Sequence, residues 1–327
     1  MIRLLAALLF SLLALQAQAR CQGADLRDHL DANQSAALTR ELAQIPYGEG
    51  NHWIARKGAR TIHIVGTMHV NDSRLNGVMR RLTPVIRSAD AVLLEVTGPE
   101  GRRFWETPEE NINLFVIRKG PGLTEVMSER GWELLSRAAL AMNLDPRRVA
   151  RIQPWFLSVL LAESFCGPRG FRPQNGLDNR IESVAIRAGV PLGSLETVAS
   201  AITVLSRRSL ADQAKMLEYD LTSSTGNDHT FVTLREAYFD ERMGSGMVLE
   251  KWQFLANAPG APRDRQRLWS NYTADILDSR NQAWVPRILG TPGNSLVVAV
   301  GAAHLPGRAG VLNLLARAGY TLERAPF

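Results

Sequence analysis

Two similar stretches of the chain read Ile-His-Ile-Val-Gly-Thr-Met-His (residues 62–69) and Leu-Val-Val-Ala-Val-Gly-Ala-Ala-His (residues 296–304). Each is an apolar, β-branched run that ends in Gly-x-x-His and is followed by a turn and then by apolar residues at helical spacing. Continuous apolar runs are typical of strands buried on both faces. The pattern therefore predicts two strand–GxxH–helix units in a sheet that helices cover.

Other strands and helices fit the same α/β class. Further strands are predicted at 91–96, 190–195 and 320–322. Helices are predicted at 73–87, at 179–188 with Asp178 as the N-cap, and at 312–318, with helical excursions over 197–257 and 263–289. The expected architecture is a central sheet flanked by helices, with a helical insertion.

The chain has 327 residues and no Ser/Gly-rich linker, which favours a single domain over residues 20–327. Residues 1–19 are typical of a signal peptide, with Arg3, an apolar run over 4–15 and an Ala-Gln-Ala site at 17–19. An uncleaved anchor is less favoured, because the run is short for a membrane span. We expect an exported protein, periplasmic or secreted, with no transmembrane segment in the mature chain.

The charge distribution bears on a nucleic-acid partner, and the cysteine content bears on a disulfide. The net charge is +6, but the basic residues are spread along the chain rather than clustered, so a nucleic-acid partner is not expected. Export makes a disulfide between Cys21 and Cys166 a candidate, although two unrelated thiols fit the sequence as well. The oligomeric state is not indicated.

Polar residues follow four of the predicted strands. His69 and His304 come just after theirs, Glu95 ends the run at 91–96, and Glu196 follows the run at 190–195. Ligands of open α/β sheets bind at the carboxyl ends of strands. Two imidazoles and two carboxylates there suit Zn²⁺, Mn²⁺ or Co²⁺, which can activate water, while a carboxylate that does not bind the metal can act as general base.

Each of these residues also has a simpler interpretation. Either histidine can cap a helix or bind a loop, Glu95 can pair with one of the many arginines, and Glu196 can be a first-turn acid. Arg280 can anchor a substrate carboxylate, pair with Glu95 or Glu196, or lie exposed. The HExxH, GxSxG, Walker A and GxGxxG motifs are absent, which argues against zincins, α/β-hydrolases, P-loop NTPases and dinucleotide enzymes.

Taken together, these motifs resemble the TraB/GumN family, which is related to the Tiki metalloproteases. The resemblance rests on segments that span nearly the whole mature chain: 65–70, 93–95, 176–178, 194–197, 279–281, 300–307 and 310–320. One departure is Ser194, where the family more often has Gly. The resemblance implies an α/β core and a metal-dependent peptidase that uses Mn²⁺ or Co²⁺. It assigns the site to His69, Glu95, Glu196 and His304, with Arg280 in support.

Two functions follow as hypotheses. The first is an exported metal-dependent hydrolase, expected to be a peptidase, with His69, Glu95, Glu196 and His304 as ligands and Zn²⁺ as a further possible metal. The second is a non-catalytic protein that sequesters a peptide or small ligand in the same cleft.

Overall fold

The computed structural model of the chain describes residues 23–164, 175–223 and 229–327. Residues 1–19, Cys21 and Cys166 lie outside the described residues, so the signal peptide and the disulfide stay predictions. Within the described ranges, no helix combines the length and the apolar character needed to cross a membrane.

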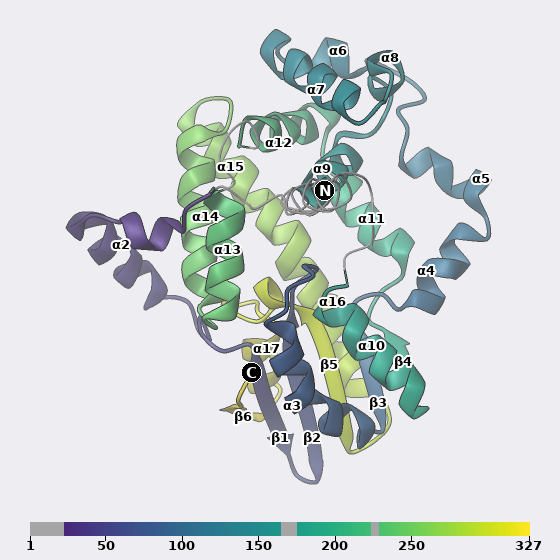
Figure 1. Cartoon of the computed structure of the whole chain (residues 1–327), viewed down its shortest axis with the longest axis vertical. Coiled ribbons are helices and arrows are strands. Elements are labelled where there is room, and N and C mark those ends of the chain that lie inside the picture. Colours follow the sequence, from purple (N-terminus) through teal and green to yellow (C-terminus); the bar gives the residue numbers. More distant parts are fainter. Residues whose placement is uncertain (1–22, 165–174, 224–228) are drawn as a thin grey trace, which may run out of the picture.

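A mixed six-stranded sheet forms the lower half of the molecule in Figure 1, in the order β4-β3-β5-β2-β1-β6. Strands β4, β3, β5 and β2 are parallel, and β1 runs antiparallel to both β2 and β6. The strands are β1 (His52–Lys57), β2 (Arg60–Thr67), β3 (Ala91–Leu94), β4 (Leu192–Ser194), β5 (Ser295–Gly301) and β6 (Thr321–Arg324).

Helices cover both faces of this sheet, which confirms the predicted α/β class. They are α3 (Leu75–Arg87), α10 (Leu177–Ala188), α16 (Arg280–Gly290) and α17 (Val311–Arg317). Alternate residues of each strand point to opposite faces. On β5, Val298 packs in the core with α16 and α17, whereas its neighbour Val297 packs in the core with α3 and α10.

A large helical region lies above the carboxyl edge of the sheet in Figure 1. It comprises α4 (Gly98–Trp105), α5 (Pro108–Asn111), α6 (Leu123–Val126), α7 (Glu129–Ala141), α8 (Pro146–Val149), α9 (Pro154–Ser164), α11 (Val198–Ser206), α12 (Leu210–Ser223), α13 (His229–Phe239), α14 (Met243–Asn257), α15 (Pro262–Thr273) and a π-helical turn, η3 (Ala274–Ser279). Helices α6 to α9 and α12 have a hydrophobic core of their own.

The remaining elements are short or peripheral. They are the 3-10 turns η1 (Leu26–His29), η2 (Ile112–Leu114) and η4 (Ala302–His304), and helix α2 (Ala32–Leu42), which projects to the left in Figure 1.

Three parts of the fold escaped the sequence patterns: α2, the helices α4 to α9, and β1. The predicted helical excursions match α11 to α16. Among the missed helices, α5, α6 and α8 have only four residues each and show no helical period. Strand β1 was also missed, since its few apolar residues lie among charged and polar ones. Strand β3 ends at Leu94, so Glu95 stands just beyond it.

Candidate functional site

The four predicted site residues stand at the carboxyl ends of four neighbouring parallel strands. His69 follows β2, Glu95 follows β3, Glu196 follows β4, and His304 ends the 3-10 turn after β5. The parallel pairing aligns these strand ends, with Thr67 opposite Gly301 in the register of β2 and β5. We call this edge, with Arg280, the carboxyl-edge site.

Arg280 contacts several residues of this site. It begins α16, directly after the π-helical turn, and its side chain is 14% exposed. Nη2 donates to Glu95 Oε2 at 2.6 Å, Nε donates to Glu196 Oε1 at 2.9 Å, and Nη2 also contacts that Glu196 oxygen. Nη1 donates to the carbonyl of Ile276 at 3.4 Å and lies 3.3 Å from His304 Nε2. One guanidinium thus contacts three of the four predicted ligands.

His304 is buried and held in one orientation. Its Nδ1 lies 2.7 Å from Asn281 Oδ1, while Asn281 Nδ2 donates to the His304 carbonyl at 3.3 Å. Its ring packs on Trp284, with centroids 4.5 Å apart. Burial lowers the pKa of His304 to about 4, although Glu95 acts in the opposite direction. His304 is therefore neutral at pH 7; with Nδ1–H donating to Asn281, the lone pair on Nε2 faces Arg280 and Glu95.

The two carboxylates differ in their surroundings. Glu95 Oε1 accepts the Gly301 N–H at 2.6 Å, and a Cβ on Gly301 would lie only 3.2 Å from that oxygen. Burial acts to raise the pKa of Glu95, but His304, Arg280 and this N–H together lower it to about 2. Burial raises the pKa of Glu196; Arg280 opposes this rise and Glu95 adds to it. Glu95 is the fixed anion of the pair, and Glu196 is the more basic carboxylate.

His69 lies in a different setting, because its side chain is 72% exposed. Its Nδ1 is 3.1 Å from Asp178 Oδ1, and the Asp178 carboxylate raises the pKa of His69. The start of α10 packs tightly on this segment: the Leu177 N–H donates to the Met68 carbonyl at 3.2 Å. A Cβ on Gly176 would approach that same carbonyl to 2.6 Å. The close approach that glycine permits brings Asp178 to the imidazole.

The structure brings Glu95, Glu196, Arg280 and His304 into one network, while His69 makes its ion pair with Asp178. Of the roles considered for Arg280, pairing with the two glutamates is the observed one. Asp178 was predicted to be an N-cap, but Gly176 occupies that position and Asp178 lies in the first turn of α10. Asn281 was missed as the partner of His304; its place directly after Arg280 was the only signal.

The other described histidines lie elsewhere. His63 lies in β2 with its Nδ1 3.1 Å from His52 Nε2. His229 begins α13, and its Nδ1 accepts the Ala24 N–H at 2.8 Å.

The donor atoms of the carboxyl-edge site decide whether a divalent ion fits there. His304 Nε2 and Glu95 Oε1 are 3.8 Å apart, a spacing that two ligands of one ion can have. Between Glu95 and Glu196, however, Arg280 occupies the position of the cation. In the part of the chain that the structure describes, no three His, Cys, Asp or Glu residues are grouped to hold a metal. The described arrangement therefore does not fit a divalent ion shared by all four residues.

Comparison with known proteins agrees with the motifs. The chain is 25% identical over 275 residues to the "Uncharacterized protein YbaP" of Escherichia coli (strain K12), an alignment that covers 81% of this chain and 94% of that protein. The protein of the same name from Shigella flexneri matches with the same identity and coverage. The model of the TraB/PrgY/gumN family matches residues 51–324, and the chain therefore belongs to the TraB/PrgY/gumN family.

Proposed function

We propose that the chain is an exported hydrolase that cleaves peptide bonds at the carboxyl-edge site. The observation that carries the proposal is the pair of carboxylates held by Arg280, whose environments move their pKa values apart, beside an exposed His–Asp pair. Such divergence is typical of groups that divide acid and base roles. The assignment to export rests on the signal-peptide pattern of residues 1–19.

Each side chain has a role in this proposal. His69 is the proton donor, because Asp178 favours its imidazolium form and its ring is open to solvent. Glu196 is the base that takes a proton from water, since its pKa is raised towards the working pH. Arg280 holds Glu196 in place and offsets the charge of Glu95. The water oxygen bonds to the peptide carbonyl carbon, and the C–N bond breaks as His69 protonates the amine leaving group.

Dependence on Mn²⁺, Co²⁺ or Zn²⁺ stays a prediction, and no step above is routed through a metal. An ion shared by Glu95 and Glu196 requires Arg280 to release at least one of them. The prediction is tested by measuring turnover after chelation and again after each metal is added back.

The decisive experiment is turnover of a fluorogenic peptide library at pH 7 by the parent chain and by His69→Ala. We expect kcat to fall about 10²- to 10⁴-fold, the usual contribution of a general acid. The control is His29→Ala, which removes an exposed histidine of η1 and should leave kcat unchanged. Unfolding midpoints show whether each variant is folded.

Parent-like turnover in both His69→Ala and Glu196→Gln would contradict the proposed roles. Saturable peptide binding without turnover, at any metal concentration, would favour the sequestering protein instead.

A further inference from the structure

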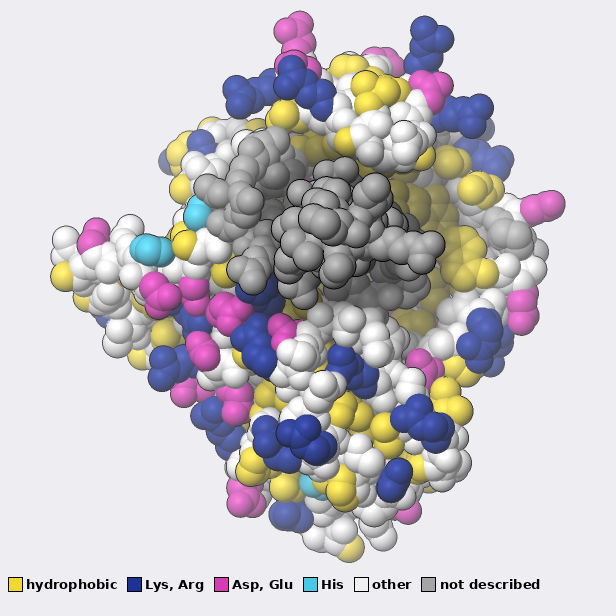
Figure 2. Space-filling view, in the orientation of Figure 1, with side chains coloured by type: hydrophobic (Ala, Val, Ile, Leu, Met, Phe, Trp, Pro, Cys, Tyr) yellow, Lys and Arg dark blue, Asp and Glu magenta, His cyan; other side chains and the backbone are white. Residues whose placement is uncertain are grey.

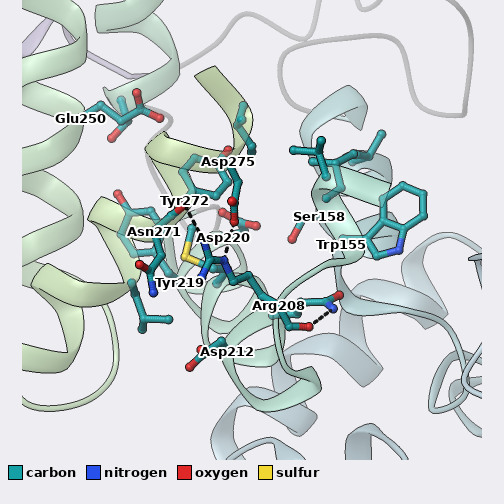
Figure 3. Close-up of a pocket in the computed structure, with 18 of the residues that line it drawn as sticks. Trp155, Ser158, Arg208, Asp212, Tyr219, Asp220, Glu250, Asn271, Tyr272 and Asp275 are labelled. Carbon is teal, nitrogen blue, oxygen red and sulfur yellow. Dashed lines mark hydrogen bonds and ion pairs between the residues drawn. The ribbon is translucent and has the colours of Figure 1, made fainter. Parts of the chain in front are cut away.

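A cavity of about 360 Å³ lies within the helical region, apart from the residues assigned above (Figure 3). We call it the helical cavity. Helices α9 and α11 to α15 and the π-helical turn contribute its walls. Most of its surface is apolar and comes from side chains that include Trp155, Val159, Val204, Met216, Phe231 and Leu268. Its size and lining are typical of sites for small organic ligands.

Two acidic side chains, Asp220 of α12 and Glu250 of α14, belong to the wall of this cavity (Figure 3). Among the described residues, neither has a Lys, Arg or His partner. Burial raises the pKa of Asp220 to about 6, against a hydrogen bond from Ser158. Burial raises the pKa of Glu250 to about 7, and Asp220 adds to this rise. Within the described ranges the two carboxyls therefore lack a counter-charge, and Asp220 makes the ionisation of Glu250 harder still.

The arginine of the same wall does not supply that charge. Arg208 Nε donates to Asp275, and its Nη2 donates to the Asn271 carbonyl at 3.3 Å. Asp275 is only 8% exposed and also pairs with Arg207 at 3.2 Å. Arg208 is thus paired with a buried carboxylate of its own, and Asp220 and Glu250 have no cation in the part of the chain that the structure describes.

A third acceptor lies in the wall. Gln213 is 7% exposed, and its Nε2 donates to the carbonyls of Ser206 and Arg208 at 3.2 and 2.8 Å. Its Oε1 is buried and has no hydrogen-bond partner in the described structure. A buried acceptor without a donor is unfavourable, so a ligand that donates to it gains affinity.

We propose that the helical cavity binds an apolar small molecule with a protonated amine, its ammonium group facing Asp220 and Glu250. An ammonium group has one positive charge and three N–H donors, which match the missing counter-charge and the carboxylate oxygens of these two residues. The apolar walls take the hydrocarbon body, and they disfavour a hydrated metal ion in the same place. This binding is independent of the proposed hydrolysis, because it uses none of the carboxyl-edge residues.

The test is isothermal titration calorimetry of the purified chain at pH 7.5 with n-octylamine, n-octanol and octanoate. These probes share the apolar chain and differ only in the head group. We expect saturable binding of one octylamine per chain, at least tenfold tighter than octanol, and no binding of octanoate. The variant Asp220→Asn/Glu250→Gln should bind octylamine at least tenfold more weakly.

The matched control is Glu218→Gln on the same helix, α12. Its carboxylate contacts Ser128, so octylamine affinity should be unchanged. The proposal is overturned if octylamine and octanol bind equally, if the double variant keeps the parent's affinity, or if octylamine shows no saturation up to about 1 mM. Binding of Mn²⁺ or Ca²⁺ that the double variant loses, in place of amine binding, would identify a metal site and also overturn it.

Discussion

Two pairs of neighbouring carboxyl groups in the chain differ in whether a cation lies beside them. At the carboxyl-edge site, Arg280 lies between Glu95 and Glu196. In the helical cavity, Asp220 and Glu250 have no such cation among the described residues. The pKa of Glu95 is lowered to about 2, whereas those of Asp220 and Glu250 rise to about 6 and 7.

The difference follows from the neighbouring charges, because burial acts to raise the pKa of all four carboxyl groups and, among the described residues, only the first pair has an arginine beside it. One region is a prearranged ionic network suited to holding groups in position. The other is a pair of carboxyl groups with no basic partner among the described residues. Figure 2 shows acidic and basic side chains mixed on the visible face.

The largest effect is expected from removing the cation of the carboxyl-edge site. Arg280→Met leaves Glu95 and Glu196 buried without compensation, and we expect the free energy of unfolding at pH 7 to fall by about 3–5 kcal/mol. Urea denaturation measures it. The control, Arg137→Met, breaks an exposed pair with Glu133 on α7 and should cost less than about 0.5 kcal/mol.

The triple variant Arg280→Met/Glu95→Gln/Glu196→Gln tests whether the lost stability comes from the uncompensated charges, because it removes them. Most of the lost stability should return. Equal effects of Arg280→Met and Arg137→Met would show that Arg280 does not compensate the two glutamates.

A smaller effect is expected from the titration of His304, which makes the free energy of unfolding depend on pH. Its folded-state pKa of about 4 lies below the ordinary value of 6.5, so only the unfolded chain binds this proton between those values. This contribution to stability is fully present above pH 6.5 and is lost as pH falls to about 4, by about 3 kcal/mol. Urea unfolding across this range should show a shallower pH dependence for His304→Gln than for the parent or Arg137→Met.

An unchanged slope in His304→Gln would mean that His304 is not held neutral. His63 provides a second case of the same sign, because burial also lowers its pKa to about 4.

The smallest effect, with the opposite sign, is expected in the helical cavity. The raised pKa values of Asp220 and Glu250 mean that the folded chain holds protons that the unfolded chain has lost, so stability falls as pH rises from about 4 to about 7. Asp220→Asn/Glu250→Gln removes this loss. It should raise the free energy of unfolding at pH 8 by about 1–2 kcal/mol, since both groups are partly exposed.

Urea denaturation of the same double variant at pH 4 serves as the control, and little gain in the free energy of unfolding is expected there. A loss of stability at pH 8 would show that the cavity already contains a compensating cation.

Much of the carboxyl-edge site was predictable, because a strand pattern and the residue that follows it are local features. Apolar runs ending before His69, Glu95, Glu196 and His304 were enough to place these residues at one edge, since parallel strands align their carboxyl ends. Gly66 lies within β2 and Gly301 ends β5, so of the two motifs it is the histidines that come after the strands.

The side chains that contact these residues were less predictable. Asn281 orients His304 from another helix, and Asp178 reaches His69 because α10 begins at Gly176 and packs on Met68. The local pattern predicted an N-cap at Asp178, because an acidic residue is favoured both at the N-cap and in the first turn of a helix.

Local patterns in the sequence were enough to predict the α/β class, the family motifs and the strand ends that carry the polar residues. The position of Arg280 between two glutamates, and the lack of a cation at Asp220 and Glu250 among the described residues, became visible only in the folded chain. The reason is physical: strand patterns arise from neighbours in the chain, but the charge state of a buried acid depends on groups that folding brings from distant segments.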